Sequence, residues 1–540
     1  MIRLTIAVPL LSLAACATAQ AAAPQPAASQ PSASQPAASQ AAPPATPASA
    51  PAVTAASESA PSLERIREEY RALQRIQAIT GWYTATQGDP ALGALTYLGH
   101  ERLFTPAALA QVDRGLAQPG LAPQEQSALK FLRRALAGEF VGLAVAHFDD
   151  EFNDAEGAAT VRVPFVDKPI AYRDVGLAIA KEPDADKRAQ LYAASGAVIE
   201  QTLNPILARK EAAAQAAART AGFADYVALS EDLRAVNLSE LLAAGVGYLK
   251  ATDALWKAEL DRAARAELNT PREKLRLADL SRLWKAPKLA GLFEKDEELK
   301  LLFHFLGGIG LDFKTVAGTE VHIDDSLLPA KRPRAFVQPI DPPNDVRLSV
   351  KPTGGLDDVW TLFHEAGHAV HFAQVTVQPS ENVQLGYGAP TEAFGEFFRH
   401  AFSDPRWLAR FRDFRKAQGH AAPTNAELAA TLRRTAMIEV LYLRRYAFAK
   451  IAYELRLHGR PLSEIAPAVA LLPHPEKVQD GSDAALRSLF QQLFSLAVGF
   501  ELSDAEANRF RVDVDDTFYS ADYSRCFALA GMMHEGVRKK

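Results

Sequence analysis

Apolar residues recur at intervals of three and four positions along most of the chain after residue 61. Three segments show this pattern over long stretches, residues 63–83, 122–136 and 184–220, and the pattern predicts helices. The third segment follows Pro183 and ends near Gly222, which are residues that commonly border helices. We therefore expect a mainly α protein.

Strand patterns are confined to one region. Residues 313–323 and 334–350 predict strands, and Val346 to Val350 alternate between apolar and polar side chains. We expect a short sheet there, directly before the segment that carries the candidate chemistry. An exposed strand edge can hold an extended peptide by backbone hydrogen bonds.

The candidate chemistry lies in residues 359–372, Val-Trp-Thr-Leu-Phe-His-Glu-Ala-Gly-His-Ala-Val-His-Phe. In a helix, His364 and His368 project from one face with Glu365 beside them, which is the H-E-x-x-H pattern of zinc proteases. Gly367 lowers helix propensity and indicates close packing against a neighbouring element. His371 lies on nearly the same face, where it supports the site or touches substrate.

A zinc protease keeps three protein ligands and one open position. Residue 374 is glutamine where a metzincin would have its third histidine, so that class is excluded. Glu392, at the start of a second predicted helix, is the candidate third ligand, and Glu381, in a polar run, is the weaker alternative. Glu396, one turn after Glu392, either accepts the free N–H of a ligand histidine or is a solvated charge.

These motifs resemble the thimet oligopeptidase and oligoendopeptidase F family of zinc metallopeptidases. The likeness rests on Asp358-Val359, on residues 361–371 and on a glutamate 24 residues after His368, with weaker similarity at residues 181–184 and 219–226. It implies that His364, His368 and Glu392 bind one Zn²⁺ per chain and that Glu365 is the catalytic carboxylate. The glycine-, tyrosine- and aspartate-rich strand segment of the family is missing here.

The resemblance also implies a fold. The expected molecule is a large two-lobed helical metallopeptidase, with a small β-sheet beside the zinc-binding helix and a deep central channel. Residues 62–310 would form the helical N-terminal half and residues 311–540 the zinc-peptidase half. Folded proteins could not enter such a channel, so the substrates would be short unstructured peptides.

Two tyrosines near the carboxyl end complete the set of candidates. Tyr519 and Tyr523 would share a helix face. The family has a tyrosine-rich segment at this distance from the end, and its phenols bind substrate and stabilise the tetrahedral intermediate, so the resemblance assigns that role to both residues. The family's third tyrosine falls at Cys526 and its preceding histidine at Val514. The alternative is that both tyrosines pack in a core with satisfied hydroxyls.

The first 61 residues differ from the rest. A short apolar run after Arg3 indicates a secretory signal peptide, residues 1–15, which is too short to span a membrane permanently. Leu13-Ala14-Ala15-Cys16 resembles a bacterial lipobox, which predicts a lipid anchor on Cys16 in the cell envelope, on the periplasmic side; ordinary cleavage after Ala21 is the alternative. Residues 16–61, rich in Ala, Pro, Ser and Gln, predict a disordered tether.

Charge and cysteine content exclude other classes. The net charge is -5 without a long basic tract, which excludes a nucleic-acid-binding protein. Cys16 and Cys526 are the only cysteines, so no disulfide framework exists. Membrane contact is expected only through the N-terminal lipid, and no feature indicates an oligomeric state.

Together these features predict a zinc-dependent oligopeptidase that cleaves internal bonds of short peptides, with Glu365 as general base toward a zinc-activated water. Two alternatives remain open. One is a peptidyl-dipeptidase that releases dipeptides from carboxyl ends, and the other is an inactive peptide-binding lipoprotein.

Overall fold

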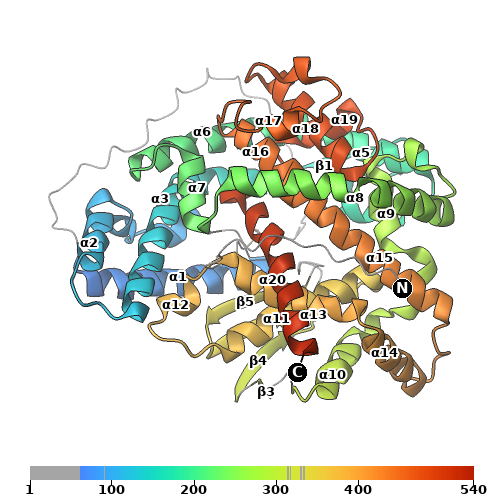
Figure 1. The fold of residues 1–540 in the computed structure, drawn as a ribbon, viewed down its shortest axis with the longest axis horizontal. Coiled ribbons are helices and arrows are strands. Elements are labelled where there is room, and N and C mark those ends of the chain that lie inside the picture. The colour runs from blue at the N-terminus through green and yellow to red at the C-terminus, as the bar shows by residue number, and fades with distance from the viewer. Residues whose placement is uncertain are drawn as a thin grey trace, which may run out of the picture.

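The structure is a computed structural model that describes residues 61–89, 92–312, 315–316, 318–328, 331 and 335–539. Helices dominate these residues and the strands form two small sheets (Figure 1), which confirms the prediction of a mainly α fold. The predicted signal peptide, the predicted lipid anchor at Cys16 and nearly all of the predicted tether lie outside the described residues. None of the described helices has the length and apolar character needed to cross a membrane.

The first half of the chain is almost entirely helical. The predicted helices appear as α1, as the first part of a longer α3, and as α5 and α6 with one π-helical turn, Ile199–Leu203, between them. The helices are α1 (Leu63–Gln87), α2 (Pro106–Leu116), α3 (Pro123–Ala158), α4 (Val175–Lys181), α5 (Ala185–Val198), α6 (Asn204–Thr220), α7 (Tyr226–Arg234), α8 (Leu238–Leu268), α9 (Leu277–Lys285) and α10 (Glu298–Gly308).

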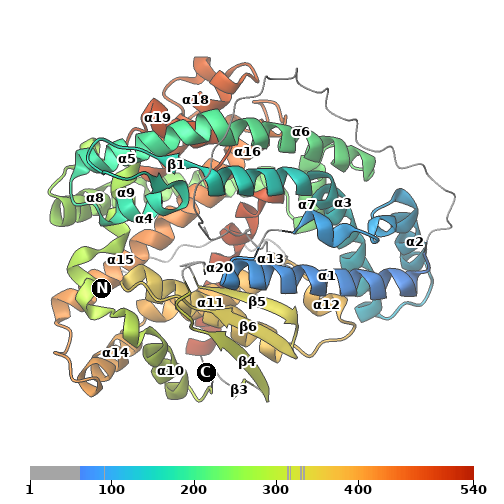
Figure 2. The same ribbon diagram turned by 180° about the vertical axis from the view of Figure 1, so that it is seen from behind.

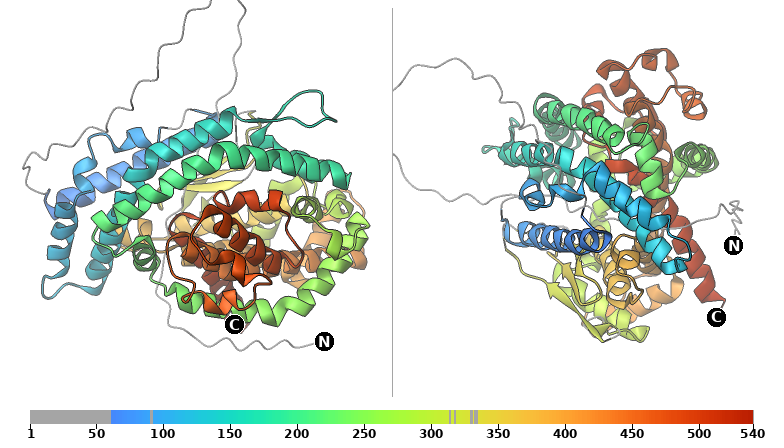
Figure 3. Two further views of the ribbon diagram at one scale, coloured as in Figure 1. Left: turned by 90° about the horizontal axis from the view of Figure 1, so that it is seen from above. Right: turned by 90° about the vertical axis from the view of Figure 1, so that its left-hand side faces the viewer.

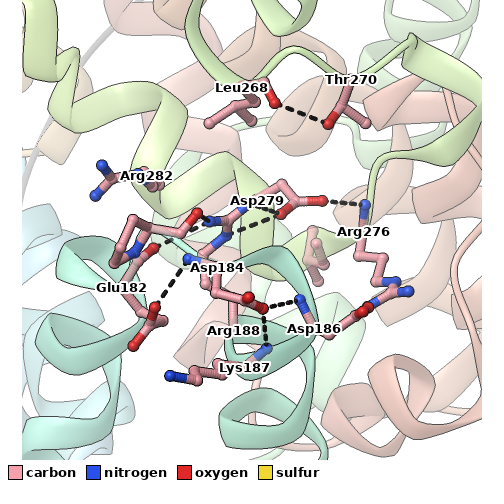
Figure 4. A network of polar contacts seen from close by, with 12 residues as sticks. Glu182, Asp184, Asp186, Lys187, Arg188, Leu268, Thr270, Arg276, Asp279 and Arg282 are labelled. Atoms are coloured by element: carbon pink, nitrogen blue, oxygen red, sulfur yellow. Dashed lines mark hydrogen bonds and ion pairs between the residues drawn. The ribbon is translucent and has the colours of Figure 1, made fainter.

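A buried ion pair joins α5 to α9 (Figure 4). Arg188 is 2% exposed and donates from Nε and Nη2 to Asp279 Oδ1 at 2.9 and 2.6 Å. Its Nη1 donates to the carbonyls of Glu182 and Pro183 at 3.0 and 2.7 Å, and Asp279 accepts the backbone N–H of Arg276 at 2.9 Å. The pair therefore fixes the connection before α5 and caps the start of α9.

The second half supplies a further set of helices around a small sheet. They are α11 (Leu356–Gln374), α12 (Glu381–Gln384), α13 (Gly388–Arg399), α14 (Pro405–Ala417), α15 (Asn425–Leu443), α16 (Ile451–Leu457), α17 (Ala466–Val469), α18 (Asp483–Val498), α19 (Asp504–Ala507) and α20 (Ser520–Arg538). Seen from above, the orange and red helices α16 to α19 lie between α6 and α8 (Figure 3).

The predicted sheet is present and has the strand order β3-β4-β6-β5. The strands are β3 (Thr315–Val316), β4 (Thr319–Asp324), β5 (Phe336–Asp341) and β6 (Asp345–Ser349); a second sheet pairs β1 (Thr160–Val161) with β2 (Ile170–Ala171). Strands β5 and β6 form an antiparallel hairpin with Gln338 opposite Arg347, and β4 runs parallel to β6. Helix α1 runs beside the edge strand β5 (Figure 2), where Trp82 lies 5.6 Å from Phe336 between ring centroids.

Two large hydrophobic cores organise the described residues. The first joins buried side chains of α1 to α3 and α6 to α9 to those of α15 to α19, and the second lies among α10, the four-stranded sheet, α11 and α14. A smaller cluster packs α4 and α5 beside β1. Helix α20 runs from beneath α7 and α8 to α13, so it connects the helices of the N-terminal half with those around the sheet (Figure 1). The predicted domain boundary at residues 310 and 311 and the deep central channel stay predictions.

Candidate metal site

Two glycines allow α11 and α13 to cross at very short distance. A Cβ atom on Gly367 of α11 would lie 2.3 Å from the carbonyl oxygen of Phe394, and one on Gly395 of α13 would lie 2.6 Å from His364 Cε1. Neither position has room for a side chain. This confirms that Gly367 marks close packing, and it brings the polar face of α13 against the histidines of α11.

The crossing brings the three predicted metal ligands together. His364 Nε2 lies 3.0 Å from His368 Nε2, and Glu392 Oε2 lies 3.2 and 3.6 Å from these two nitrogens. Zinc ligands about 2.1 Å from the ion in tetrahedral geometry would be about 3.4 Å apart. All three residues are buried, and Glu392 Oε2 has no well-formed hydrogen bond within the described part of the chain. Their atoms therefore fit one zinc ion.

A buried ion pair supports His364 from behind. Glu396 is 1% exposed, its Oε1 lies 3.4 Å from His364 Nδ1, and its other oxygen is bound by Arg399. Burial alone would raise the pKa of Glu396, but Arg399 and His364 hold that pKa below its ordinary value. The Arg399 guanidinium also lies 3.5 Å above the Trp360 ring. The structure thus places Glu396 beside a predicted ligand histidine, away from solvent.

Thr391 contacts the Nδ1 atom of the second histidine, His368. Its hydroxyl lies 3.0 Å from His368 Nδ1 and 3.1 Å from His371 Nδ1. Burial and the nearby His368 lower the pKa of His371 to about 4, so His371 is neutral at pH 7 and its Nδ1 can accept the Thr391 proton. The Thr391 oxygen can then accept from His368 Nδ1–H, which leaves the His368 Nε2 lone pair directed at the metal position.

Thr391 is not among the residues that the sequence predicts for the site. The one feature of the sequence that could have indicated Thr391 is its position directly before Glu392, at the start of α13. Only the closeness of α11 and α13 shows that its hydroxyl reaches two histidines of another helix.

Glu365 faces the sheet. Its Oε2 accepts the backbone N–H of Val337, on strand β5, at 3.0 Å. Because Val337 donates to Glu365 and not to β6, its backbone N–H and C=O point away from β6. The C=O of Pro339, two residues on, points the same way. Proline has no N–H, so this part of the β5 edge offers carbonyl oxygens while its one donor holds Glu365.

The structure brings Tyr519 to the candidate ligand Glu392. The Tyr519 hydroxyl donates to Glu392 Oε1 at 2.6 Å, so one carboxylate oxygen is held while Oε2 faces the histidines. Burial, followed by the charge of Glu392, raises the pKa of Tyr519, so the phenol keeps its proton. Tyr523 packs between aromatic rings, 5.0 Å from the centroids of both Tyr519 and Tyr446.

Glu381, the weaker candidate for the third ligand, lies apart from the two histidines. Glu381 of α12 lies 2.9 Å from Arg67 Nε on α1 and is not among the residues that converge with the histidines. Cys526 is fully buried, and its Sγ donates to the Tyr523 carbonyl at 3.0 Å.

A second group of potential ligand residues occurs in the described chain, Glu294, Glu297 and His420. Arg415 lies 3.4 Å from Glu294 and 3.2 Å from Glu297, and Glu294 is 46% exposed. Both carboxylates of this cluster are therefore already paired with an arginine.

The fold of this chain is similar to the folds of several solved structures. No protein-family model and no curated protein matches the chain. Among solved structures, metallocarboxypeptidase 1 of Trypanosoma cruzi has a TM-score of 0.51 at 14% identity, over 88% of this chain and 86% of that one. A structure described as oligoendopeptidase F has a TM-score of 0.51 at 15% identity, over 88% and 83% of the two chains. A Chlamydophila abortus protein described as a peptidase has a TM-score of 0.52 at 13% identity, over 86% and 78%.

The chain therefore has a mainly α fold that it shares with several peptidases. Among the named examples, the fold resembles that of oligoendopeptidase F.

Proposed function

We propose that this protein is a zinc-dependent oligopeptidase that hydrolyses internal bonds of short, unstructured peptides. One observation carries the proposal. The lone pairs of His364, His368 and Glu392 converge at a buried helix crossing, with the carboxylate of Glu365 on the same helix as the two histidines. The fold shared with peptidases supports it.

Zinc bound by these three residues would polarise the peptide carbonyl and lower the pKa of a water molecule toward neutrality. The chain prepares the position in advance, because Glu396 and Thr391 lie against the Nδ1 atoms of the two histidines and leave Nε2 of each for the metal. Tyr519 fixes the remaining ligand by its hydrogen bond to Glu392 Oε1.

Glu365 is the proposed general base. It takes a proton from the attacking water and passes it to the leaving amine, a role that typically contributes about a hundredfold to ten-thousandfold in rate. The Val337 N–H orients the carboxylate by its hydrogen bond to Glu365 Oε2. Tyr519 or Tyr523 donates to the oxyanion, and Tyr519 does so only after releasing Glu392 Oε1.

The β5 edge is the proposed seat of the substrate backbone. The outward carbonyls of Val337 and Pro339 would accept N–H groups from an extended peptide, which excludes substrates that are already folded. A peptide bound in this way would pass close to Glu365, because Val337 belongs to the edge strand and its N–H donates to the Glu365 carboxylate.

The decisive comparison is between Glu365→Gln and Glu381→Gln in the full-length protein. Metal content and cleavage of a mixed peptide library, with and without chelator, are measured for both variants by mass spectrometry. We expect one zinc per chain throughout, chelator-sensitive internal cuts in the unaltered protein and in Glu381→Gln, and no cuts in Glu365→Gln. Retained cleavage in Glu365→Gln, or a metal-free protein, would overturn the proposal.

A second candidate is the release of dipeptides from carboxyl ends. The likeness in fold to a metallocarboxypeptidase supports only that cleavage occurs at that end of a peptide. The same library distinguishes the two activities, because products would then come only from the carboxyl ends of the peptides. Zinc binding without any cleavage would instead favour the peptide-binding lipoprotein.

We also propose that the protein is exported to the bacterial cell envelope and anchored by lipid on Cys16. Mass spectrometry of the mature N-terminus should show a lipidated cysteine, and Cys16→Ala should move the protein from the membrane fraction to the soluble fraction. An unmodified N-terminus at Ala22 would contradict the anchor.

A further inference from the structure

The turn before α20 adopts a conformation that its residues do not favour. Thr517 has φ 49° and ψ 37°, and Phe518 has φ 55°, so two successive residues other than glycine lie in the left-handed region. Such a conformation is unfavourable for a residue that carries a Cβ atom. Tyr519 follows directly, so other parts of the molecule must hold the turn that aims its phenol at Glu392.

Arg234, the last residue of α7, makes three hydrogen bonds to this turn. Its Nε donates to the Thr517 carbonyl, and its Nη2 donates to Thr517 Oγ1 at 2.6 Å and to the Asp516 carbonyl at 3.3 Å. Its Nη1 pairs with Asp522 of α20. The guanidinium also lies 4.8 Å from the centroid of the Tyr519 ring.

Residues of α7, α13 and α20 pack around Arg234 and the turn. The Tyr226 hydroxyl, at the other end of α7, accepts the Thr517 N–H at 2.7 Å. Asp522 is fully buried between Arg234 and Arg525, and a Cβ on Gly388, the first residue of α13, would lie 2.6 Å from Asp522 Oδ2. One cluster therefore connects α7, the start of α20 and the start of α13.

We propose that Arg234 is a positioning residue. From the N-terminal half of the chain, it locks the left-handed turn at Thr517 and Phe518 and thereby keeps the Tyr519 hydroxyl on Glu392. Its catalytic consequence rests on the proposed function. Its effect on the turn and on metal binding does not depend on turnover.

Arg234→Lys keeps a positive charge beside Asp522 but cannot make the several hydrogen bonds to Asp516 and Thr517. We expect the metal to bind about tenfold to a hundredfold more weakly, as when a group that orients a ligand is lost. Tyr519→Phe should weaken metal binding by a similar factor. The double variant should be no weaker than Tyr519→Phe alone, because the lysine substitution acts through Tyr519.

The test measures metal affinity of the full-length protein by competition with a chromophoric chelator. Hydrogen–deuterium exchange of residues 515–521 is measured in the same variants without metal. Arg188→Lys is the matched control, since Arg188 is equally buried and equally paired but joins α5 to α9. It should lower thermal stability and leave metal affinity and the exchange of residues 515–521 unchanged.

Two further variants extend the test, and the second of them keeps the proposal testable if Arg234→Lys folds poorly. Thr517→Gly relieves the left-handed strain, so it should restore part of the metal affinity lost in Arg234→Lys. Tyr226→Phe removes one acceptor from the turn and should cause a smaller loss, absent in the Tyr519→Phe background.

Two results would overturn the role of Arg234: unchanged exchange of residues 515–521 in Arg234→Lys, or an equal loss of metal affinity with and without the Tyr519 hydroxyl. Failure of the proposed function looks different. In that case the unaltered protein cleaves no peptide, while the exchange and affinity differences among the variants persist.

Discussion

Replacing Gly367 by alanine tests whether the helix crossing builds the metal site. The new methyl carbon would lie 2.3 Å from the Phe394 carbonyl oxygen, 2.7 Å from its carbon and 2.8 Å from Gly395 Cα. Carbon and oxygen atoms without a bond between them rarely come closer than about 3.3 Å. Helix α13 must therefore move away from α11 by about 1 Å.

The free energy of unfolding should change little, while metal affinity should change strongly. Overpacking typically costs about 1–3 kcal/mol, and replacing glycine by alanine within a helix returns about 1 kcal/mol, so a net loss of about 0–2 kcal/mol is expected. A 1 Å shift of Glu392 relative to His364 and His368 exceeds the tolerance of about 0.2 Å for zinc–ligand distances. We expect metal affinity to fall at least about a hundredfold.

Chelator competition gives the metal affinity, and denaturant unfolding without metal gives the stability. Gly247→Ala is the matched control, because Gly247 is an exposed residue within α8 whose added Cβ would meet no atom within 4 Å. This control should gain up to about 1 kcal/mol and bind metal normally. Undiminished metal affinity in Gly367→Ala would show that the close crossing does not place the ligands.

Two more predictions concern groups around α11. Thr391→Val removes the oxygen that contacts His368 and His371 and should weaken metal binding about tenfold to a hundredfold in the same competition assay, with Thr391→Ser restoring it; equal affinities would contradict this role. Burial, followed by the neighbouring Asp358, raises the pKa of Glu298 from 4.5 to about 9, so between these pH values the folded protein holds a proton that the unfolded chain releases. As pH rises through this window, this group should lower the free energy of unfolding by up to about 1.4 kcal/mol per pH unit. Glu298→Gln should show a shallower pH dependence in urea unfolding, and an unchanged slope would exclude this cause.

The fold was predictable where the information is local. Residues 63–83 and 184–220 form helices close to their predicted limits, and residues 345–349 form β6, because periodicity and flanking residues act over a few positions. The predicted helix 122–136 continues to Ala158. It continues through Gly138 and Gly142, and a Cβ on Gly142 would lie 3.0 Å from the Tyr97 hydroxyl.

The candidate site was predictable only in part, for the same reason. His364, Glu365 and His368 lie within one turn of helix, so their spacing alone indicates a shared metal position. The contacts of Val337 with Glu365 and of Arg234 with Thr517 depend on how distant elements pack. No pattern within either segment indicates them.

The position of α20 has a consequence for synthesis. Tyr519, which holds the candidate ligand Glu392, comes after every other element of the site in the chain, and the residue that fixes its turn, Arg234, comes 285 residues earlier (519 − 234). A ribosome-bound chain would present His364, His368 and Glu392 well before the last helix emerges. We therefore expect nascent chains to lack the completed site until α20 has emerged from the ribosome and packed onto α13.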